Sequence, residues 1–193
     1  MENDLPQKAA NKVPWARLRA KIERLRNDNP LYVFLFRSLA LYIAWYVLYE
    51  IWLHPSEALD IWVIRSTLTC ALFILKLIGY HVFSGTDRLM GIDGTNGLWM
   101  GDSCNCLELC ALFAGFVLAF PGQAKRKIWF IPLGMVLIFI INVLRMAALA
   151  IIQKHFSLAL LNFNHTYTFT ILVYLFIFIL WYYWVKMNVK FRI

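Results

Sequence analysis

The fold of this chain follows from the segment IWFIPLGMVLIFIINVLRMAALAII at residues 128–152, which contains no acidic side chain and one cation, Arg145. A helix of about 20 apolar residues is long enough to cross the hydrocarbon core of a bilayer. Four more apolar segments lie near residues 31–53, 60–82, 104–121 and 166–186. The sequence therefore predicts an all-α fold, a polytopic bundle of transmembrane helices.

The composition also indicates a membrane protein. Hydrophobic residues make up 61% of the 193 residues, against roughly 45–50% in soluble domains. The formal net charge is +8, and the basic residues cluster at the ends of the apolar segments. In a membrane protein such an excess marks cytoplasmic loops rather than a nucleic-acid site. We therefore expect membrane lipid, and no nucleic acid, among the partners.

The apolar segments divide the chain into three parts. Residues 1–30 form a basic segment with an amphipathic helical pattern, which fits either an anionic membrane surface or a solvated cytoplasmic helix. Residues 31–186 would form the transmembrane catalytic domain, and residues 187–193 a basic tail. Residues 84–103 are rich in Gly, Asp, Asn and Thr, which predicts a short external hairpin-like loop before the third helix.

The charges of the loops predict the orientation of the helices. The basic loop at residues 123–127 and the basic tail should lie in the cytoplasm. Cys104 then lies at the outer end of the third segment, and His165 directly precedes the fifth. Arg145 lies roughly 25 Å along the fourth segment, at about 1.5 Å per residue. Three separate segments thus deliver a thiol, a guanidinium and an imidazole to the outer side of the membrane.

The amino terminus conflicts with this orientation. Its basic residues should also lie in the cytoplasm, and then a full crossing by residues 60–82 would put Cys104 on the wrong side. In one solution this segment, with Arg65 and Lys76 nearly on one helical face, does not fully cross. In the other, the amino terminus is external. The sequence leaves both open.

The three polar side chains fit a covalent reaction. At the start of a helix, free backbone N–H groups would stabilise a Cys104 thiolate. Arg145 stays charged and could stabilise an oxyanion, and His165 could act as general base and then general acid. Each also has a plain structural interpretation: an interfacial cysteine, an arginine reaching toward the lipid headgroups, and a polar residue at a helix start.

Neighbouring residues suggest supporting roles. Asn142 precedes Arg145 by one turn. Glu108 follows Cys104 by one turn, from where it could orient Arg145 or His165.

Other histidines and cysteines offer alternatives. His54, His81 and His155 compete with His165 for the role of base. Cys106 and Cys110 could join Cys104 and His165 around a metal ion, but their spacing is not a common zinc pattern, so we expect no metal.

These motifs resemble those of the exosortase/archaeosortase family of prokaryotic membrane transpeptidases, in particular its compact Bacteroidetes-type members. That family has Cys followed by Ser or Asn and then Gly, an Asn-x-x-Arg on the next long helix, and a later His or Arg before another helix. The matching residues here are Cys104-Asn105, Asn142-Val-Leu-Arg145 and His165, within a resemblance that covers roughly residues 60–185. Cys106 departs from it, because it occupies the position of the Gly.

The resemblance implies a thiol protease or transpeptidase that cleaves carboxy-terminal sorting signals from exported proteins. Cys104 would form a thioester, Arg145 would hold the oxyanion and His165 would carry the proton, with Asn105, Glu108 and Asn142 in support. Water, or an amine of a lipid or glycan, would resolve the thioester, and no cofactor is needed. The expected location is the bacterial inner (cytoplasmic) membrane, crossed several times, with the active site facing the periplasm or exterior.

Two other classes of function remain open. In a non-catalytic membrane assembly or scaffold protein, Arg145 and Glu108 would pair to lock the bundle. The other class is a membrane acyltransferase or thiol-redox protein; in the redox case Cys104 and Cys106 would form the reactive pair.

Overall fold

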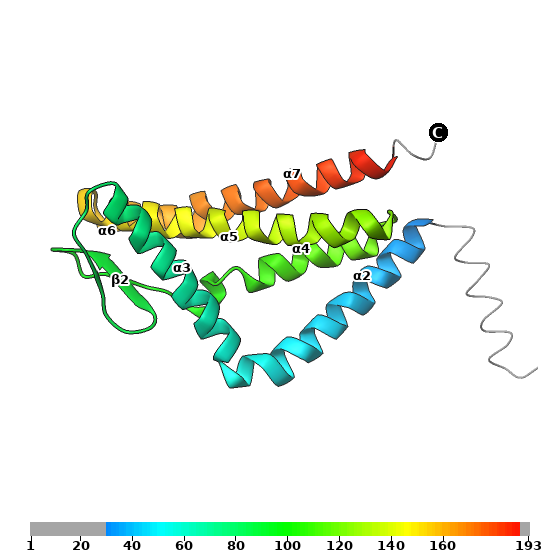
Figure 1. Ribbon diagram of the computed structural model, residues 1–193, viewed down its shortest axis with the longest axis horizontal. Helices are drawn as coiled ribbons and strands as arrows, with labels where there is room; N and C mark the ends of the chain where they lie inside the picture. The colour runs from blue at the N-terminus through cyan, green and yellow to red at the C-terminus, as the bar shows by residue number, and fades with distance from the viewer. Residues whose placement is uncertain (1–29, 190–193) are drawn as a thin grey trace, which may run out of the picture.

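The computed structural model describes residues 30–189. The expected basic segment at residues 1–30, apart from its last residue, and residues 190–193 of the expected tail lie outside the described part. The helices are α2 (Pro30–Tyr46), α3 (Ala58–Leu77), α4 (Leu107–Ala119), α5 (Ala124–His155), α6 (Leu158–Phe163) and α7 (Phe169–Val189). Figure 1 shows them as an elongated bundle.

The predicted all-α transmembrane bundle is confirmed. Among the described residues, the helical segments that are long and apolar enough to cross a membrane are Leu31–Ser56, Ala58–Leu77, Ala124–His155 and Leu158–Asn188. The π-helical turn Val47–Leu53 extends α2, and the π-helical turn Asn164–Thr168 joins α6 to α7. Helix α4 is apolar but shorter, and it begins three residues later than expected.

Two hydrophobic cores follow one another along the molecule. In the first, residues of α3 and of the loop before α4 pack on the second half of α5; its members include Ile64, Leu68, Met90, Met146 and Leu149. In the second, α4 and α7 pack on the first half of α5; its members include Phe113, Val117, Phe130, Ile138 and Trp184. The long helix α5 is therefore the common support of both halves.

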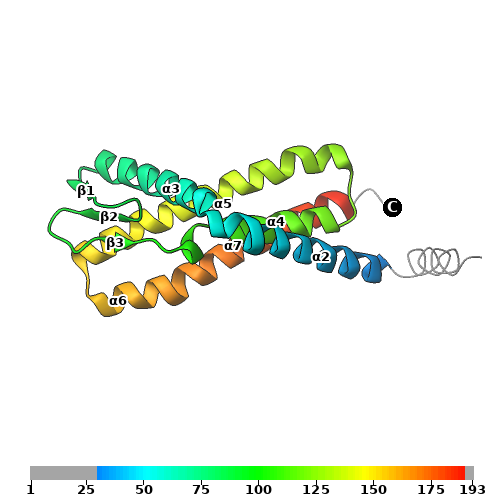
Figure 2. The ribbon, with the colours of Figure 1, turned by 90° about the horizontal axis from the view of Figure 1, so that it is seen from below.

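Helix α3 continues the direction of α2 along the molecule. Helix α2 begins at the end where α4 and α7 end and α5 begins, and it runs toward the middle (Figures 1 and 2). The turn His54–Ser56 and the left-handed Glu57 (φ 51°) bend the chain, and α3 then runs on to the opposite end. Helix α3 therefore does not return toward the end where α2 begins (Figures 1 and 2).

The predicted hairpin loop contains a small antiparallel sheet. Its strands β1 (Val82–Ser84), β2 (Leu89–Ile92) and β3 (Leu98–Trp99) pair in the order β1-β2-β3. Val82 pairs with Ile92, and Leu89 with Trp99.

Helix α5 anchors this sheet, because the Gln153 amide donates to the carbonyl of Gly97 (2.9 Å) and Lys154 Nζ to that of Asp93 (2.7 Å). Gly97 has φ 78°, in the left-handed region that glycine tolerates.

An arginine ties the sheet to the start of α4. Arg88 donates to Asp102 Oδ1 at 2.6 Å and lies 3.5 Å from Glu57 Oε2. The hydrogen bond to Asp102 holds the pKa of Arg88 above its ordinary value. These contacts join the bend between α2 and α3 to the loop that enters α4.

Close packing of α4 on α5 depends on Gly134. A Cβ atom at this position would overlap the ring of Phe113, whereas a Cβ at Gly115 of α4 would meet nothing within 4 Å. We predict that Gly134→Ala destabilises the bundle by about 1–3 kcal/mol through overpacking. Gly115→Ala is the matched control and should not destabilise it. Thermal unfolding of the detergent-purified protein measures both, and equal melting temperatures for the two variants would contradict this account.

Candidate active site

Cys104 ends a short 3₁₀ turn, Asp102–Cys104, and lies three residues before α4. The expected position in the first turn of α4 is therefore wrong. The reason lies at Cys106, whose backbone adopts the left-handed conformation (φ 65°, ψ 1°) directly before the helix. A residue in this conformation interrupts a right-handed helix, so α4 starts only at Leu107.

Cys106 occupies the position where the resemblance leads us to expect Gly. Its positive φ gives a physical reason for glycine there, because L side chains are strained in this region. The residue is buried, at 5% exposure. Hydrogen bonding with Cys110 and burial raise the pKa of the Cys106 thiol. Both cysteines line the pocket, but Cys104 is half-buried whereas Cys106 is buried, so Cys104 is the more accessible of the two.

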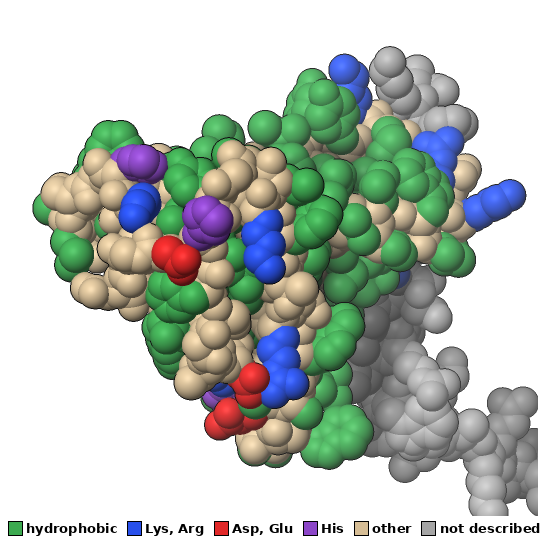
Figure 3. All heavy atoms as spheres, turned by 60° about the vertical axis from the view of Figure 1, so that its left-hand side comes forward, with side chains coloured by type: hydrophobic (Ala, Val, Ile, Leu, Met, Phe, Trp, Pro, Cys, Tyr) green, Lys and Arg blue, Asp and Glu red, His purple; other side chains and the backbone are tan. Residues whose placement is uncertain are grey.

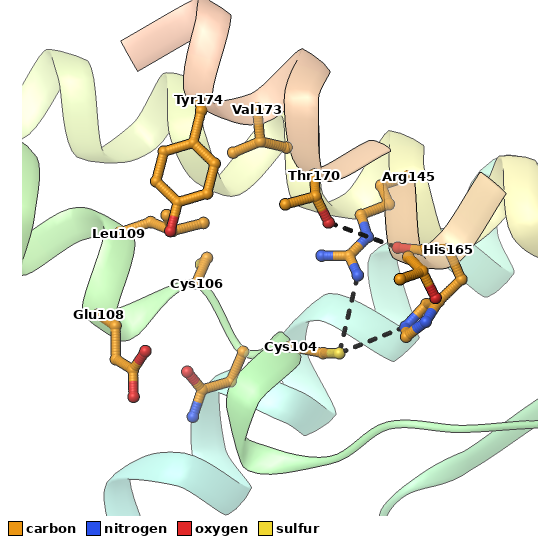
Figure 4. Close-up of a pocket in the computed structure, with 11 residues that line it drawn as sticks. Cys104, Cys106, Glu108, Leu109, Arg145, His165, Thr170, Val173 and Tyr174 are labelled. Carbon is orange, nitrogen blue, oxygen red and sulfur yellow. Dashed lines mark hydrogen bonds between the residues drawn. The ribbon is translucent and has the colours of Figure 1, made fainter. Parts of the chain in front are cut away.

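Arg145 and His165 both approach the Cys104 sulfur. Arg145 Nη2 lies 3.7 Å and His165 Nε2 3.6 Å from Cys104 Sγ. The guanidinium comes from α5, the imidazole from the turn between α6 and α7, and the thiol from the loop before α4 (Figure 4). The structure thus brings together the three side chains that the sequence singled out.

His165 lies within a helix rather than before one. The helical segment is continuous from α6 through the π-helical turn Asn164–Thr168 into α7. The Thr170 hydroxyl donates to the His165 carbonyl at 3.5 Å. Single π-helical turns often occur at functional sites, and apolar periodicity alone gives no signal for one.

Arg145 is buried in an apolar helix and retains free donor capacity. The residue is 9% exposed, and its Nε atom has no hydrogen-bond partner within the described residues. Its Nη2 atom donates to Cys104 Sγ. Because a guanidinium carries five N–H donors, this arginine can still receive an anionic oxygen atom.

Asn142 and Asn105 hold the backbone of the loop that carries Cys104. The Asn142 amide, one turn before Arg145, donates to the Cys104 carbonyl at 3.0 Å. Asn105 Oδ1 accepts from the backbone N–H of Leu107 at 3.0 Å, which closes an Asx turn directly before α4. The two asparagines thus support Cys104 through its main chain.

Glu108 does not make the expected orienting contact. The residue is exposed, and among the described residues no ion pair joins it to Arg145 or His165. The expectation assumed one helix face running from Cys104 to Glu108, and the left-handed Cys106 breaks that face. Glu108 still lines the pocket, with its carboxylate turned away from Arg145 (Figure 4).

The pocket beside these side chains has a volume of about 310 Å³. It opens between the start of α4 and the first turns of α7, with Cys104, Arg145 and His165 at its polar end. Leu109, Val173 and Tyr174 form an apolar part.

The competing histidines lie elsewhere. His155 Nε2 is 3.0 Å from the Tyr80 hydroxyl, His54 lies near Asp60, and His81 precedes β1. None of the three lines the pocket. No group of three or more His, Cys, Asp or Glu side chains in the described part of the chain is arranged to hold a metal ion.

Sequence reasoning missed Asp60, which is fully buried beside the loop that carries Cys104. It accepts hydrogen bonds from Tyr49 and Asn105. The available signal was a lone carboxylate at the start of the apolar segment 60–82.

In comparisons with known proteins, no family model matches the chain, and neither a curated protein nor a solved structure matches it. Its function must therefore be argued from the residues and their geometry.

The contacts at Cys104 predict its reactivity. We expect iodoacetamide to alkylate Cys104 faster than Cys106 and Cys110, because the latter two are buried. Arg145→Gln should slow this alkylation several-fold, since it removes a cation that stabilises the thiolate. Arg65→Gln, which removes a cation from an exposed pair with Asp87, is the matched control. Peptide mapping by mass spectrometry gives the rates, and faster alkylation at Cys106 would contradict the assignment.

The strained backbone at Cys106 gives a second prediction. Cys106→Gly should be more stable than Cys106→Ala by about 1 kcal/mol, because only glycine is relieved of the left-handed strain. Both variants lose the same thiol, so the difference between their free energies of unfolding measures the backbone strain at position 106. Chemical denaturation in detergent measures it, and an alanine variant as stable as the glycine variant would show that φ at this position is not positive.

Proposed function

We propose that this chain is a membrane-embedded thiol protease or transpeptidase of the exosortase type, with Cys104 as its nucleophile. The observation that supports this most strongly is the approach of Arg145 and His165 to Cys104 Sγ from separate segments. Placing a charged or titratable side chain in an apolar membrane helix costs free energy unless that side chain interacts with another polar group or with a substrate. Here both converge on a thiol at a pocket.

The proposed reaction begins with proton transfer from the Cys104 thiol to His165 Nε2. The sulfur then attacks the scissile carbonyl carbon, and the carbonyl oxygen becomes an oxyanion that the Arg145 guanidinium stabilises. When the C–N bond breaks, the leaving amine takes the proton from His165, and a thioester remains on Cys104. Water or an amine, with His165 again as base, attacks the thioester and releases the thiol.

The distribution of charge supports an orientation for this site. The start of α5 carries Lys125, Arg126 and Lys127, and the last turn of α7 carries Lys186. By the positive-inside rule this end belongs in the cytoplasm. The sheet end, where cationic, acidic and histidine side chains gather (Figure 3), then faces the periplasm or exterior of a bacterial inner membrane.

The course of α2 and α3 fits this orientation. Helix α2 begins at the basic end, and α3 runs on toward the sheet end instead of returning. A cytoplasmic amino terminus is then compatible with Cys104 on the outer side. The substrate would be an exported protein whose carboxy-terminal sorting signal reaches the pocket from the membrane, and the acceptor would be water or the amine of a lipid or glycan.

The scaffold alternative is less well supported. It requires Arg145 and Glu108 to lock the bundle as an ion pair. Within the described residues Arg145 instead contacts the Cys104 sulfur, and Glu108 is exposed without an ion pair.

Acylation by a small activated ester tests the proposed chemistry without a known substrate. We predict that p-nitrophenyl acetate places an acetyl group on Cys104 of the purified full-length chain, and that neutral hydroxylamine removes it as it does other thioesters. His165→Gln should lower the acylation rate about 100-fold by loss of the general base. Arg145→Gln should lower it by a similar factor, about 10²–10³, by loss of oxyanion stabilisation.

His155→Gln is the matched control, because His155 bonds to Tyr80 away from the pocket. Its acylation rate should equal that of the wild type. Acetyl groups on another cysteine, or equal rates for the His155 and His165 variants, would contradict the proposal.

A further inference from the structure

A buried polar cluster lies behind Cys104, on the side away from the pocket, and the proposed reaction does not use it. Its centre is Asp60 at the start of α3, which has 0% exposure. The Tyr49 hydroxyl donates to Asp60 Oδ1 at 2.7 Å, and the Asn105 amide donates to the same oxygen. His54 Nδ1 lies 3.6 Å from Oδ2. Burial of a carboxyl group costs free energy unless the group is hydrogen-bonded, so the partners of Asp60 must be held in place around it.

Asn105 connects this cluster to the nucleophile. Both ends of its amide are committed: the NH₂ group donates to Asp60, and Oδ1 accepts from Leu107 N–H at 3.0 Å. These two hydrogen bonds therefore fix the orientation of the Asn105 amide. They also hold the backbone between Cys104 and α4, where Cys106 has its positive φ. Asn105 is 1% exposed and is the next residue after Cys104.

A second clamp acts on the same peptide segment from the other side. The Asn142 amide of α5 donates to the Cys104 carbonyl at 3.0 Å. The loop is thus held between Asp60 of α3 and Asn142 of α5. These two helices also share the first hydrophobic core, so their spacing is defined by packing.

We infer that Asp60 is a positioning residue for the Cys104 sulfur, acting through Asn105; this rests on the proposed function. Asp60 does not line the pocket and touches no reacting group. It sets the place of the loop on which the thiol stands, relative to Arg145 and His165. Displacement of a reacting atom by about 1 Å can cost on the order of 100-fold in rate.

The test compares variants of the full-length protein in detergent by two rates at Cys104, alkylation by iodoacetamide and acetylation by p-nitrophenyl acetate. Asp60→Ala removes the acceptor, and both rates should fall at least about tenfold. Asp60→Asn keeps an oxygen that can accept from Asn105, so it should recover most of the loss. Asp87→Ala, which breaks an exposed ion pair with Arg65, should leave both rates unchanged.

A double-mutant cycle separates positioning from general destabilisation. If Asp60 acts through Asn105, then Asp60→Ala combined with Asn105→Ala is no slower than Asn105→Ala alone. Additive losses, or an Asp60→Ala protein with wild-type rates, would overturn the inference. If Asp60→Ala does not fold, Tyr49→Phe replaces it in the cycle: it removes one donor to Asp60, and its smaller loss of rate should also vanish in the Asn105→Ala background.

The two rates distinguish this inference from the proposed function. If the wild type is not acetylated on Cys104, the proposed function fails, and the alkylation rates still decide whether Asp60 positions the thiol. If the wild type is acetylated and Asp60→Ala matches it in both rates, the positioning role fails and the proposed function stands.

Discussion

The guanidinium of Arg145, buried in an otherwise apolar helix, is the constraint on which the rest of the structure depends. A permanent cation at 9% exposure needs an electron-rich partner, and its contact is the Cys104 sulfur at 3.7 Å. That contact, together with the hydrogen bond from Asn142 to the Cys104 carbonyl, joins the loop before α4 to α5. Asn142 and Asp60, the latter through Asn105, hold the backbone of the same loop. The π-helical turn that carries His165 brings the imidazole to the Cys104 sulfur.

The site lies where the two hydrophobic cores meet. On one side α4, α7 and the first half of α5 form a bundle whose outer surface is largely apolar, with exposed residues such as Ile128, Val136, Leu175 and Phe178. On the other side α3 and the sheet pack on the second half of α5 and carry more charged side chains. At this junction the Cys104 thiol borders both polar side chains, Arg145 and His165, and the apolar part of the pocket formed by Leu109 and Val173.

Much of this architecture could be predicted from the sequence. The length of the apolar segments predicted the helix bundle, and the glycine-rich loop predicted the hairpin. The loop charges, together with the positions along the segments, predicted that Cys104, Arg145 and His165 lie near the same end of their helices. Local backbone conformation could not be predicted in the same way. The left-handed Cys106 delays α4 and removes the role expected for Glu108, and the π-helical turn places His165 within a helix. Asp60 escaped notice because its partners are distant in sequence and meet only through tertiary packing.

The most direct test of the account is labelling of Cys104 in intact bacterial cells with a membrane-impermeant maleimide. Cys70, Cys106 and Cys110 would be replaced by alanine, so that Cys104 is the remaining thiol. A second protein, in which Cys104 is also replaced by alanine and Lys125→Cys supplies the remaining thiol, shows on which side of the membrane the basic start of α5 lies. The account predicts that Cys104 is labelled in intact cells and that the thiol at position 125 is labelled only after permeabilisation. Labelling of Cys104 only after permeabilisation would contradict an external thiol nucleophile.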